Sequence, residues 1–381
     1  MLNTEMIFSD SYYLGKALDF ANQFDYRTYP NPCVGCVLVK NGEIVSYGAS
    51  EPQGKRHAEV AAIDNAKLAG VDVSGCCAYV TLEPCCHFGK TPPCTSYLLS
   101  HNIKKVVIGL LDPNPLVSSK GADILKSHGV EVIVIEDEKL NEKIFLSMRG
   151  FLNFHTNKKP WIRLKTALSI DGVMALSNGV SQWITGIEAR LHNQRLRARA
   201  GAVLTSIKTV ICDNPLMNVR EFDRSDKHFN LNQPLRVVLD THANGSDFMH
   251  YEIFKHQDKF PLLWICGENC DRDKFNKLSK ITNVIKFPLR LNNHICLNAV
   301  INYLYELNIN EVHVEAGAIL TSAFIEQDLF DETAIYQAPV FLGNGTRLMR
   351  NIDLINLENM KKLKIVENKI VGQDLFIDMV K

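Results

Sequence analysis

Two short segments in the first quarter of the sequence carry residue types that can hold a metal ion and move protons beside it. They are His57-Ala58-Glu59 and the stretch from Glu83-Pro84-Cys85-Cys86 to Pro92-Pro93-Cys94. One imidazole and two thiolates suit zinc, and three protein ligands leave a fourth position for water, whose pKa the metal lowers to about 7. Residues two apart on a helix do not share a face, so Glu59 can stay off the metal and carry protons. The spacing therefore predicts a hydrolytic zinc site.

The second thiol ligand needs a separate argument. Zinc-dependent nucleobase deaminases carry H-x-E followed by P-C-x-x-C, with the glutamate left free for proton transfer. Here Phe88 stands three residues after Cys85, so the next thiol is either Cys86 or Cys94. Side chains of adjacent residues diverge, whereas Cys94 begins a predicted helix whose N-terminal dipole favours a thiolate. We therefore expect His57, Cys85 and Cys94 to hold the zinc ion.

The cysteine count is consistent with a metal site. Seven of the 11 cysteines lie between Cys33 and Cys94, a density that marks metal binding more often than disulfides in an intracellular protein. The alternative to a catalytic site is a structural site closed by Cys86 or His87 as fourth ligand. Such a closed site would leave Glu59 without a role, so we favour the catalytic interpretation.

Alternating helices and strands are predicted around these segments. An amphipathic helix with Leu14 and Leu18 on its apolar stripe is followed by a hairpin over 34–47 that turns at Asn41-Gly42. A helix over 58–67 starts at the histidine segment. Further strands are predicted at 78–82, 106–109 and 130–135, with helices near 95–100 and 122–127. This order predicts a mixed sheet with helices on its faces.

A second α/β series follows a boundary region at 141–160, which includes Lys158-Lys159-Pro160. Its strands are predicted at 161–168, 202–205, 235–239, 262–265 and 312–315, with helices between several of them. A chain of 381 residues is long for a single core. We therefore expect two domains, at residues 1–149 and 150–381.

Composition limits the classes of partner. The 42 lysines and arginines balance the 42 aspartates and glutamates, so no global field draws the chain to nucleic acid or anionic lipid. No segment reaches the ~20 apolar residues of a membrane span, and the N-terminus lacks the pattern of a signal peptide. We expect a cytoplasmic enzyme with a small-molecule substrate, and neither a nucleic-acid partner nor a membrane partner.

Longer motifs around the same residues resemble one bifunctional family. TLEPCCHFGKTPPC, with NPCVGCVLV, HAEV and LLDPNP, is similar to the deaminase half of the riboflavin-biosynthesis deaminase–reductases of the RibD type. KTALSIDG, SQWIT, LTSIKTVICDNPLMNVR and VEAGAILTSAF resemble the reductase half, in the family's order. The resemblance implies an α/β chain with a cytidine-deaminase-like three-layer mixed sheet and then a dihydrofolate-reductase-like domain. The long gap between the two cysteines is typical of this family.

The resemblance implies two consecutive reactions. Zinc-dependent hydrolysis would deaminate 2,5-diamino-6-ribosylamino-4(3H)-pyrimidinone 5′-phosphate to 5-amino-6-ribosylaminouracil 5′-phosphate. NADPH would then reduce the ribosyl side chain to a ribityl side chain. We accordingly expect one Zn²⁺ ion per chain, NADPH as the second cofactor and a homo-oligomer. The choice of NADPH over NADH follows from the family alone.

Site residues are implied by the same match, with Glu59 as the proton shuttle of the first site. The first substrate would be held by Asn31, His87, Lys90, Asp112 and Asn114. The second would be held by Lys165, Ser181, Arg197, Met217, Arg220 and Glu315. The cofactor would lie against Ala167, Trp183, Thr209, Asp213, Thr241, Gly317, Ala318, Ile319, Leu320, Thr321, Ser322 and Ala323.

The residue types suit these roles. Guanidinium groups bind phosphate with two parallel hydrogen bonds, so Arg197 and Arg220 are expected to anchor the substrate phosphate. Lys165 and Asp171 are candidates for handling the proton in the reduction. The simpler interpretation of Arg190, Arg195 and Arg199 is a solvated helix face, and Trp183 could be an ordinary core residue.

Other functional classes fit the sequence less well. A nucleic-acid deaminase should carry a basic surface, and a zinc module without activity would not need Glu59. A deaminase joined to an inactive reductase is the more serious alternative, although the presence of Lys165, Asp171, Arg197 and Glu315 argues against it. A pterin or folate reductase is suggested only by analogy of fold.

Overall fold

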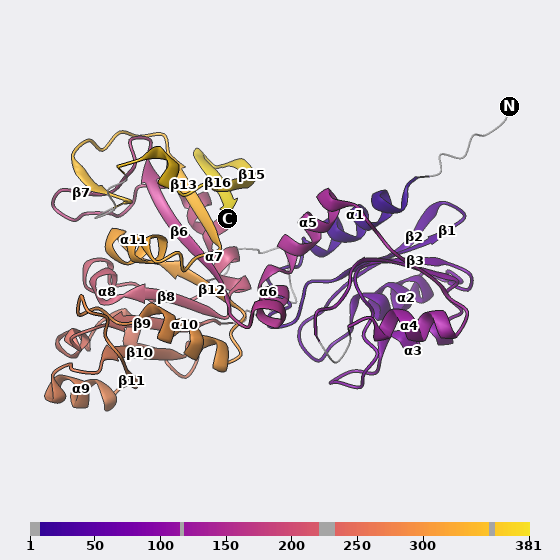
Figure 1. Cartoon of the computed structure of the whole chain (residues 1–381), viewed down its shortest axis with the longest axis horizontal. Coiled ribbons are helices and arrows are strands. Elements are labelled where there is room, and N and C mark those ends of the chain that lie inside the picture. Colours follow the sequence, from indigo (N-terminus) through magenta and orange to yellow (C-terminus); the bar gives the residue numbers. More distant parts are fainter. Residues whose placement is uncertain (1–7, 115–117, 221–232, 350–354) are drawn as a thin grey trace. The chain divides into compact units, whose positions relative to one another are not determined.

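The computed structural model describes residues 8–114, 118–220, 233–349 and 355–381. The chain divides into two compact units, Met1–Lys158 and Lys159–Lys381. Each unit has its own sheet (Figure 1). Each also has its own hydrophobic core. Two α/β domains, the fold class expected from the sequence, are thereby confirmed.

A five-stranded mixed sheet forms the centre of the first unit. Its strands are β1 (Gly35–Lys40), β2 (Glu43–Ala49), β3 (Cys77–Leu82), β4 (Lys105–Leu110) and β5 (Glu131–Val134), in the order β2-β1-β3-β4-β5. β1 is antiparallel to β2 and β3, whereas β3, β4 and β5 are parallel. The start of β1 and the ends of β2, β3 and β4 therefore lie at one edge of the sheet, where the predicted first site must form.

Helices cover both faces of this sheet, in the expected three layers. They are α1 (Asp10–Ala21), α2 (Ala58–Leu68), α3 (Cys94–Ser100), α4 (Lys120–Ser127), α5 (Glu138–Ser147) and α6 (Arg149–Asn157). α1 and α5 lie on one face, while α2, α3 and α4 lie on the other (Figure 1). Ser9 caps α1, because its hydroxyl accepts a hydrogen bond from the Tyr12 N–H.

Two glycines allow helices to lie directly on this sheet. A β-carbon at Gly35 would come within 2.0 Å of the Ala17 carbonyl oxygen of α1, and one at Gly48 within 2.1 Å of the Ala58 carbonyl oxygen of α2. Any side chain at either position would push its helix away. Because Ala58 is the first residue of α2, the contact with Gly48 fixes where the helix that carries Glu59 begins.

The second unit is built on a nine-stranded sheet, which is parallel except at one edge. Its order is β11-β10-β9-β8-β12-β6-β13-β16-β15. The pairs β13–β16 and β16–β15 are antiparallel, and the other neighbouring pairs are parallel. The strands are β6 (Trp161–Ser169), β8 (Ala202–Ser206), β9 (Leu235–Asp240), β10 (Leu262–Gly267), β11 (Asn283–Phe287), β12 (Glu311–Glu315), β13 (Glu332–Ala338), β15 (Lys364–Val371) and β16 (Asp374–Val380). The five predicted strands, at 161–168, 202–205, 235–239, 262–265 and 312–315, are confirmed as β6, β8, β9, β10 and β12.

Both faces of the second sheet are buried at its central parallel strands, as such strands require, whereas the edge strand β15 is mostly exposed. Successive residues point to opposite faces, so Val237 joins the cluster beneath α10 and α11, while Val238 joins the cluster beneath α8 and α9. The helices are α7 (Ile187–Arg199), α8 (Ile207–Asp213), α9 (Arg272–Ser279), α10 (Leu297–Glu306) and α11 (Ala318–Glu326), with 3₁₀ turns η1 (Asn244–Asp247), η2 (Glu252–Phe254) and η3 (Leu357–Asn359). A separate two-stranded antiparallel sheet pairs β7 (Val173–Leu176) with β14 (Gly345–Arg347), which lies far along the chain.

The division between the units falls later than residue 149. Met148 and Leu152 belong to the core of the first unit, and Arg149 and Asn153 are also buried. Helix α6 is thus part of the first unit, and the break comes at Lys158, within the boundary region predicted at 141–160. Ending the first domain at residue 149 would remove a helix that contributes to its core.

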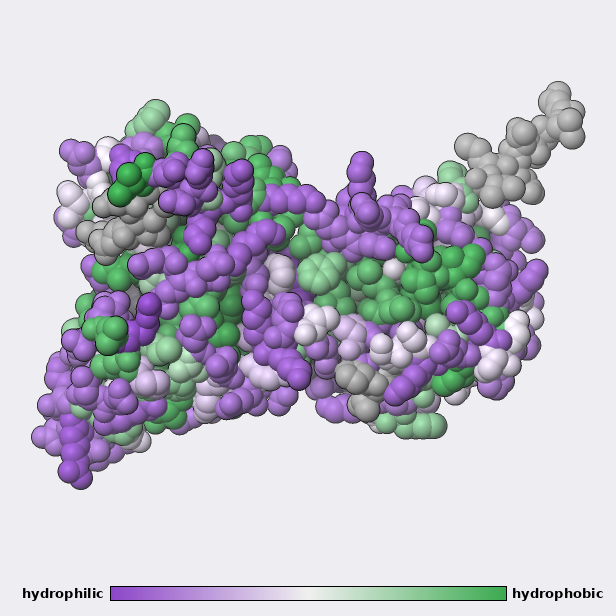
Figure 2. Space-filling model, in the orientation of Figure 1, coloured by the Kyte–Doolittle hydropathy of each residue, from purple (hydrophilic) through white to green (hydrophobic). Residues whose placement is uncertain are grey.

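The face drawn in Figure 2 carries many hydrophilic residues, with hydrophobic residues gathered in patches between them. Among the described residues, none of the helices combines the length and the apolar character needed to cross a bilayer.

Candidate functional site

The predicted zinc ligands come together at the sheet edge of the first unit. The Nδ1 atom of His57 lies 3.5 Å from the Cys85 sulfur and 3.3 Å from the Cys94 sulfur. All three candidate ligand atoms lie within 4.8 Å of one another. One imidazole nitrogen and two thiols at these separations fit a tetrahedral zinc ion with one position left for a non-protein ligand.

Neighbouring elements fix each of these ligands. His57 directly precedes α2, and Cys85 follows β3 by three residues. Cys94 is the first residue of α3, and its backbone N–H points to the Cys85 sulfur at 3.4 Å. Hydrogen bonds from Cys94 and His57 lower the pKa of the Cys85 thiol to about 4, so a thiolate is present at neutral pH.

Neither alternative fourth ligand joins this group. Among the described residues, the set of close histidine, cysteine and carboxylate groups contains His57, Cys85 and Cys94 but not Cys86 or His87. The geometry therefore favours an open three-ligand site over a closed structural one.

Glu59 lies beside the three ligands without joining them. It sits in the first turn of α2, only 3% exposed, and its carboxylate accepts a hydrogen bond from the Cys94 thiol. Burial and the negative charge of Cys85 raise the pKa of Glu59 to about 7. A carboxyl group with a pKa near neutrality can both take up and release a proton, as a proton shuttle must.

The residues expected to hold the first substrate lie on loops at the same edge. Asn31 precedes β1, His87 and Lys90 follow β3, and Asp112 and Asn114 follow β4. Asp112 is buried, which raises its pKa to about 6, and its carboxylate accepts a hydrogen bond from the Asn114 N–H at 2.8 Å. Lys90 is exposed and His87 is half-buried.

Glu83 organises this edge, although sequence reasoning assigned it no role. Its buried carboxylate accepts hydrogen bonds from the backbone N–H groups of Asp112 at 3.2 Å, Ser119 at 3.0 Å and Ala122 at 3.1 Å. It thereby joins the end of β3 to the loop after β4 and to the first turn of α4. A β-carbon at Gly121 would lie 2.1 Å from the Pro84 carbonyl oxygen, so glycine is needed for this approach.

A cavity of about 940 Å³ opens in the second unit. All six residues expected to hold the second substrate line it: Lys165, Ser181, Arg197, Met217, Arg220 and Glu315. Of the cofactor residues, it is lined by Ala167, Trp183, Thr209, Asp213, Thr241, Gly317, Ala318, Ile319, Leu320 and Ala323. The segments that carry them are spread from β6 to α11, and the parallel sheet brings them to one site.

Thr321 and Ser322 do not line this cavity. Both are buried in α11, where the Thr321 hydroxyl donates to the Ala316 carbonyl at 3.3 Å and the Ser322 hydroxyl to the Leu348 carbonyl at 3.0 Å. A helix can present only one face to a cavity, so a continuous run of seven contacting residues was not possible. Contact of these two residues with the cofactor therefore stays a prediction to which the lining of the cavity gives no support.

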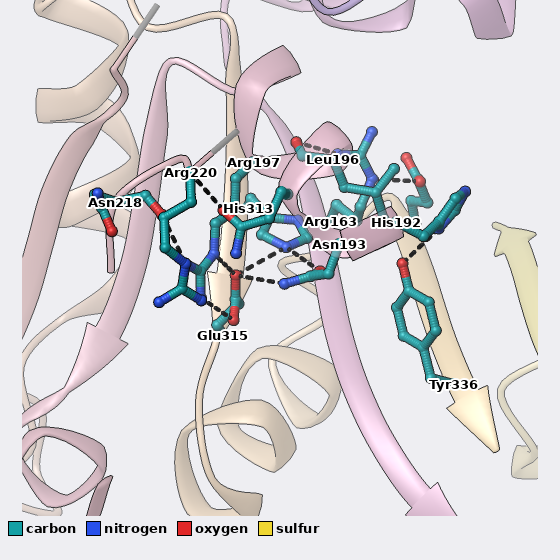
Figure 3. A network of polar contacts seen from close by, with 12 residues as sticks. Arg163, His192, Asn193, Leu196, Arg197, Asn218, Arg220, His313, Glu315 and Tyr336 are labelled. Atoms are coloured by element: carbon teal, nitrogen blue, oxygen red, sulfur yellow. Dashed lines mark hydrogen bonds and ion pairs between the residues drawn. The ribbon is translucent and has the colours of Figure 1, made fainter. Parts of the chain in front are cut away.

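Arg197 is not a freely available phosphate anchor. Its Nε donates to Glu315, one terminal nitrogen donates to the other Glu315 oxygen at 2.8 Å, and the second terminal nitrogen donates to the Asn218 carbonyl at 2.8 Å (Figure 3). Burial alone would raise the pKa of Glu315, but the Arg197 guanidinium holds it well below its ordinary value. Arg220, exposed at the same cavity, is the better candidate for a phosphate.

Two further polar residues complete this network. Asn193 donates to Glu315 at 3.0 Å, and the fully buried His313 has its Nε2 3.1 Å from the Asn193 side-chain oxygen (Figure 3). They come from α7 and β12. Neither was predicted, because a single asparagine or histidine in an element carries no motif.

Lys165 and Asp171 differ in their suitability for proton transfer. Lys165 lies at the cavity, and burial lowers the pKa of its ammonium group. Asp171 instead accepts hydrogen bonds from Ser169, Leu342 N–H and Gly343 N–H, and these lower its pKa to about 2. These contacts join the turn after β6 to the loop at Leu342 and Gly343, and they support Asp171 as a proton donor less well than the cavity position supports Lys165.

Trp183 and Arg190 lie at the mouth of the cavity. The Trp183 side chain is 68% exposed, and the Arg190 guanidinium lies over its ring, 4.2 Å from the centroid. Trp183 is therefore not a core residue, and Arg190 is part of the cavity wall and not of a solvated helix face.

Comparison with known proteins gives the same division of the chain. Residues 8–110 match the family "Cytidine and deoxycytidylate deaminase zinc-binding region", and residues 160–377 match the family "RibD C-terminal domain". The riboflavin biosynthesis protein RibD of Escherichia coli is 35% identical, over 97% of this chain and 99% of its own. That of Haemophilus influenzae is 38% identical, over 96% of each.

Solved structures agree over nearly the full length. Acinetobacter baumannii RibD superposes with a TM-score of 0.82 at 36% identity, covering 97% of this chain and 98% of the other. A Thermotoga maritima protein described as a diaminohydroxyphosphoribosylaminopyrimidine deaminase/5-amino-6-(5-phosphoribosylamino)uracil reductase gives 0.80 at 29% identity, with the same coverage.

Proposed function

The chain belongs to the RibD family of riboflavin biosynthesis proteins, and from this premise we propose which of its residues perform the family's two reactions. It is a bifunctional enzyme, a deaminase joined to a reductase. The observation that carries the proposal for the first reaction is the group His57, Cys85 and Cys94, whose ligand atoms lie within 4.8 Å of one another beside a buried glutamate.

In the first unit, His57, Cys85 and Cys94 hold one zinc ion. Bound there, zinc would activate a water molecule for attack on the ring carbon that carries the amino group. Glu59 would take up one proton of that water and deliver it to the ring nitrogen. It would then take the remaining proton from the hydroxyl added to the ring carbon and deliver it to the departing amino group, which leaves as ammonia. The substrate is the diaminopyrimidinone ribosylamino 5′-phosphate, with Asn31, His87, Lys90, Asp112 and Asn114 around its ring and phosphate.

In the second unit, the cavity holds the deaminated product and NADPH. NADPH supplies the hydride that reduces the ribosyl group to ribityl. Arg220 binds the phosphate, while the Arg197–Glu315 pair fixes a carboxylate on the cavity wall for the sugar hydroxyls. Lys165 Nζ supplies the proton that accompanies the hydride, because burial lowers the pKa of its ammonium group.

We also propose that the enzyme works in the cytoplasm and as a homo-oligomer. Both proposals are carried over from the resemblance to the family. Sedimentation of the purified protein would measure the oligomeric state.

Product masses test the two activities separately. Incubation of the purified protein with zinc and the diaminopyrimidinone phosphate should add about 1 Da to the substrate, since an amino group is replaced by oxygen. Addition of NADPH should add about 2 Da more, since two hydrogens enter. A mass gain in the first step alone would indicate a deaminase joined to an inactive reductase.

A matched variant assigns the first step to Glu59. Glu59→Gln keeps the size and polarity of the side chain but cannot shuttle protons, so we expect deamination to fall by about 10²–10⁴-fold. Zinc content and reduction of the supplied deaminated intermediate should stay at wild-type levels. Unchanged deamination in this variant would remove Glu59 from the mechanism.

A further inference from the structure

His57 uses its two ring nitrogens for different neighbours. The Nδ1 atom faces the sulfurs of Cys85 and Cys94 at 3.5 and 3.3 Å. The Nε2 atom, on the other side of the ring, lies 3.2 Å from the Thr91 hydroxyl oxygen. His57 stands at the start of α2 but its side chain makes no capping hydrogen bond there. The ring is therefore oriented by Thr91 on one side and the cysteines on the other.

We propose that Thr91 is a positioning residue that holds His57 in the orientation and tautomer required of a zinc ligand. The proposal rests on the zinc site proposed above. In it, Nε2 carries the ring proton and donates it to the Thr91 hydroxyl, which leaves the Nδ1 lone pair free for the metal. A histidine ligand needs such a partner for its outer nitrogen, because the partner fixes both the ring angle and the position of the proton.

Thr91 also gives a reason for the long segment between the two cysteines. Eight residues separate Cys85 from Cys94, where the short deaminase motif has two. Two intervening residues would leave no loop that could pass the far side of the His57 ring. The longer loop does pass it and returns through Pro92 and Pro93 to the start of α3. The extra residues thus supply a hydrogen-bond partner, Thr91, for the ring nitrogen of His57 that faces away from the metal site.

The loop holds Thr91 in a defined place. The Gly89 N–H donates to the Thr91 carbonyl at 3.2 Å, which closes a turn before it. After it, two prolines restrict the backbone, and the Thr95 N–H donates to the Cys85 carbonyl at 3.2 Å. Because both ends of the loop are tied, the hydroxyl is presented to His57 by a restrained backbone. Such restraint is what positioning requires.

Thr91→Val tests the proposal, because valine keeps the branched shape and removes the hydroxyl. The measurement is zinc affinity of the full-length protein, by competition with a coloured chelator. We expect Thr91→Val to bind zinc about 10–100-fold more weakly than wild type, the usual effect of losing a ligand's outer partner. Thr91→Ser keeps the hydroxyl and should bind within a few-fold of wild type.

A matched control is available in the same unit. The Thr156 hydroxyl donates to the Leu152 carbonyl within α6, so Thr156→Val removes a threonine hydroxyl elsewhere in the unit. It should not change zinc affinity. Equal zinc affinity of wild type and Thr91→Val would overturn the proposal, as would equal weakening by Thr91→Val and Thr91→Ser.

Two further experiments test the proposal independently of whether Thr91→Val folds. If Thr91→Val does not fold, Thr91→Ala compared with Thr91→Ser makes the same comparison without the β-branched side chain. Nitrogen NMR of the zinc-loaded wild type should show His57 protonated at Nε2, and a proton at Nδ1 would contradict the proposal. Absence of zinc binding by wild type would instead overturn the proposed zinc site itself, and the role of Thr91 with it.

Discussion

Arg197 and Glu315 form a two-point ion pair on the wall of the cavity in the second unit, although 118 residues separate them in the sequence. Both side chains are at most 12% exposed. A buried pair of this kind is seldom a net source of stability, but removal of one partner strands the other charge in a dry environment. Substitution of either Arg197 or Glu315 alone should therefore destabilise the wall of the cavity.

Arg197→Ala should impair reduction and leave deamination unchanged. Loss of the guanidinium leaves the Glu315 carboxylate buried without its main partner, which costs about 3–5 kcal/mol of folding stability in comparable cases. The second unit should unfold at lower temperature, and the variant should reduce the supplied deaminated intermediate more slowly. Differential scanning calorimetry and the two separate activity assays measure these effects.

A variant without either charge distinguishes two causes of instability: an unpaired buried carboxylate at Glu315, and the absence of the ion pair. The double variant Arg197→Met with Glu315→Gln should recover stability relative to Arg197→Ala, because no uncompensated charge remains. Its reduction activity should stay low. An equal loss of both activities in Arg197→Ala would contradict the assignment of Arg197 to the second unit's site alone.

The same pair shows why part of the site could not be predicted. A hydrophobic or motif pattern places Arg197 on a helix and Glu315 at the end of a strand, but it does not say that the two meet. The prediction of a phosphate anchor treated Arg197 as an isolated guanidinium. Its pairing depends on α7 lying across β12, which is a property of the assembled sheet.

Local motifs, by contrast, were sufficient for the metal group and for most strands. His57 and Glu59 are fixed by the start of α2, and Cys94 by the start of α3, so short-range signals decided their geometry. Strand β10 is a continuous apolar run up to Gly267, and β9 carries Val237, Val238 and Leu239 between Arg236 and Asp240, so that both were predicted as strands. Thr91 and Glu83 were missed because their partners lie 34 and 29–39 residues away and no periodicity marks them.

The first unit should fold and function alone when it ends at Lys158. Its core includes Met148 and Leu152, so a fragment of residues 1–158 should retain every core cluster that the unit has. We expect this fragment to bind one zinc equivalent and to deaminate. Circular dichroism, metal analysis and the deamination assay provide the measurements.

A shorter fragment is the natural comparison. Residues 1–149 lack α6, and burial of a leucine side chain stabilises a domain by about 1.5–3 kcal/mol. The shorter fragment should therefore melt at a lower temperature than the fragment of residues 1–158. If both fragments melt alike, α6 contributes nothing to the first unit and the boundary belongs at residue 149.

Glu83→Gln should weaken substrate binding in deamination. The glutamine side chain offers one carbonyl oxygen in place of the two oxygens that accept from Asp112, Ser119 and Ala122. Loss of a hydrogen bond to a charged group costs about 1.5–3 kcal/mol, so the loop that carries Asp112 should lose its fixed position. We expect KM for the diaminopyrimidinone phosphate to rise about tenfold.

Reduction within the same chain is the internal control for Glu83→Gln. It should remain at the wild-type level, as should the zinc content per chain. A fall in zinc content in proportion to activity, with KM unchanged in the loaded fraction, would show that Glu83 supports the fold and does not position the substrate loop.

Exchange of the cysteines one at a time tests the zinc ligands directly. Cys86→Ser should retain one zinc equivalent and full deamination, because Cys86 lies outside the group of three ligand atoms. Cys94→Ser should lose both, since the Cys94 sulfur lies 3.3 Å from His57 Nδ1 and a serine hydroxyl binds zinc poorly unless it is deprotonated. Reduction should survive in both variants, which shows that the second unit is folded, and circular dichroism of the fragment of residues 1–158 with the same substitution checks the first unit. The assignment would be overturned if Cys94→Ser kept a full zinc equivalent by metal analysis while Cys86→Ser was purified without zinc.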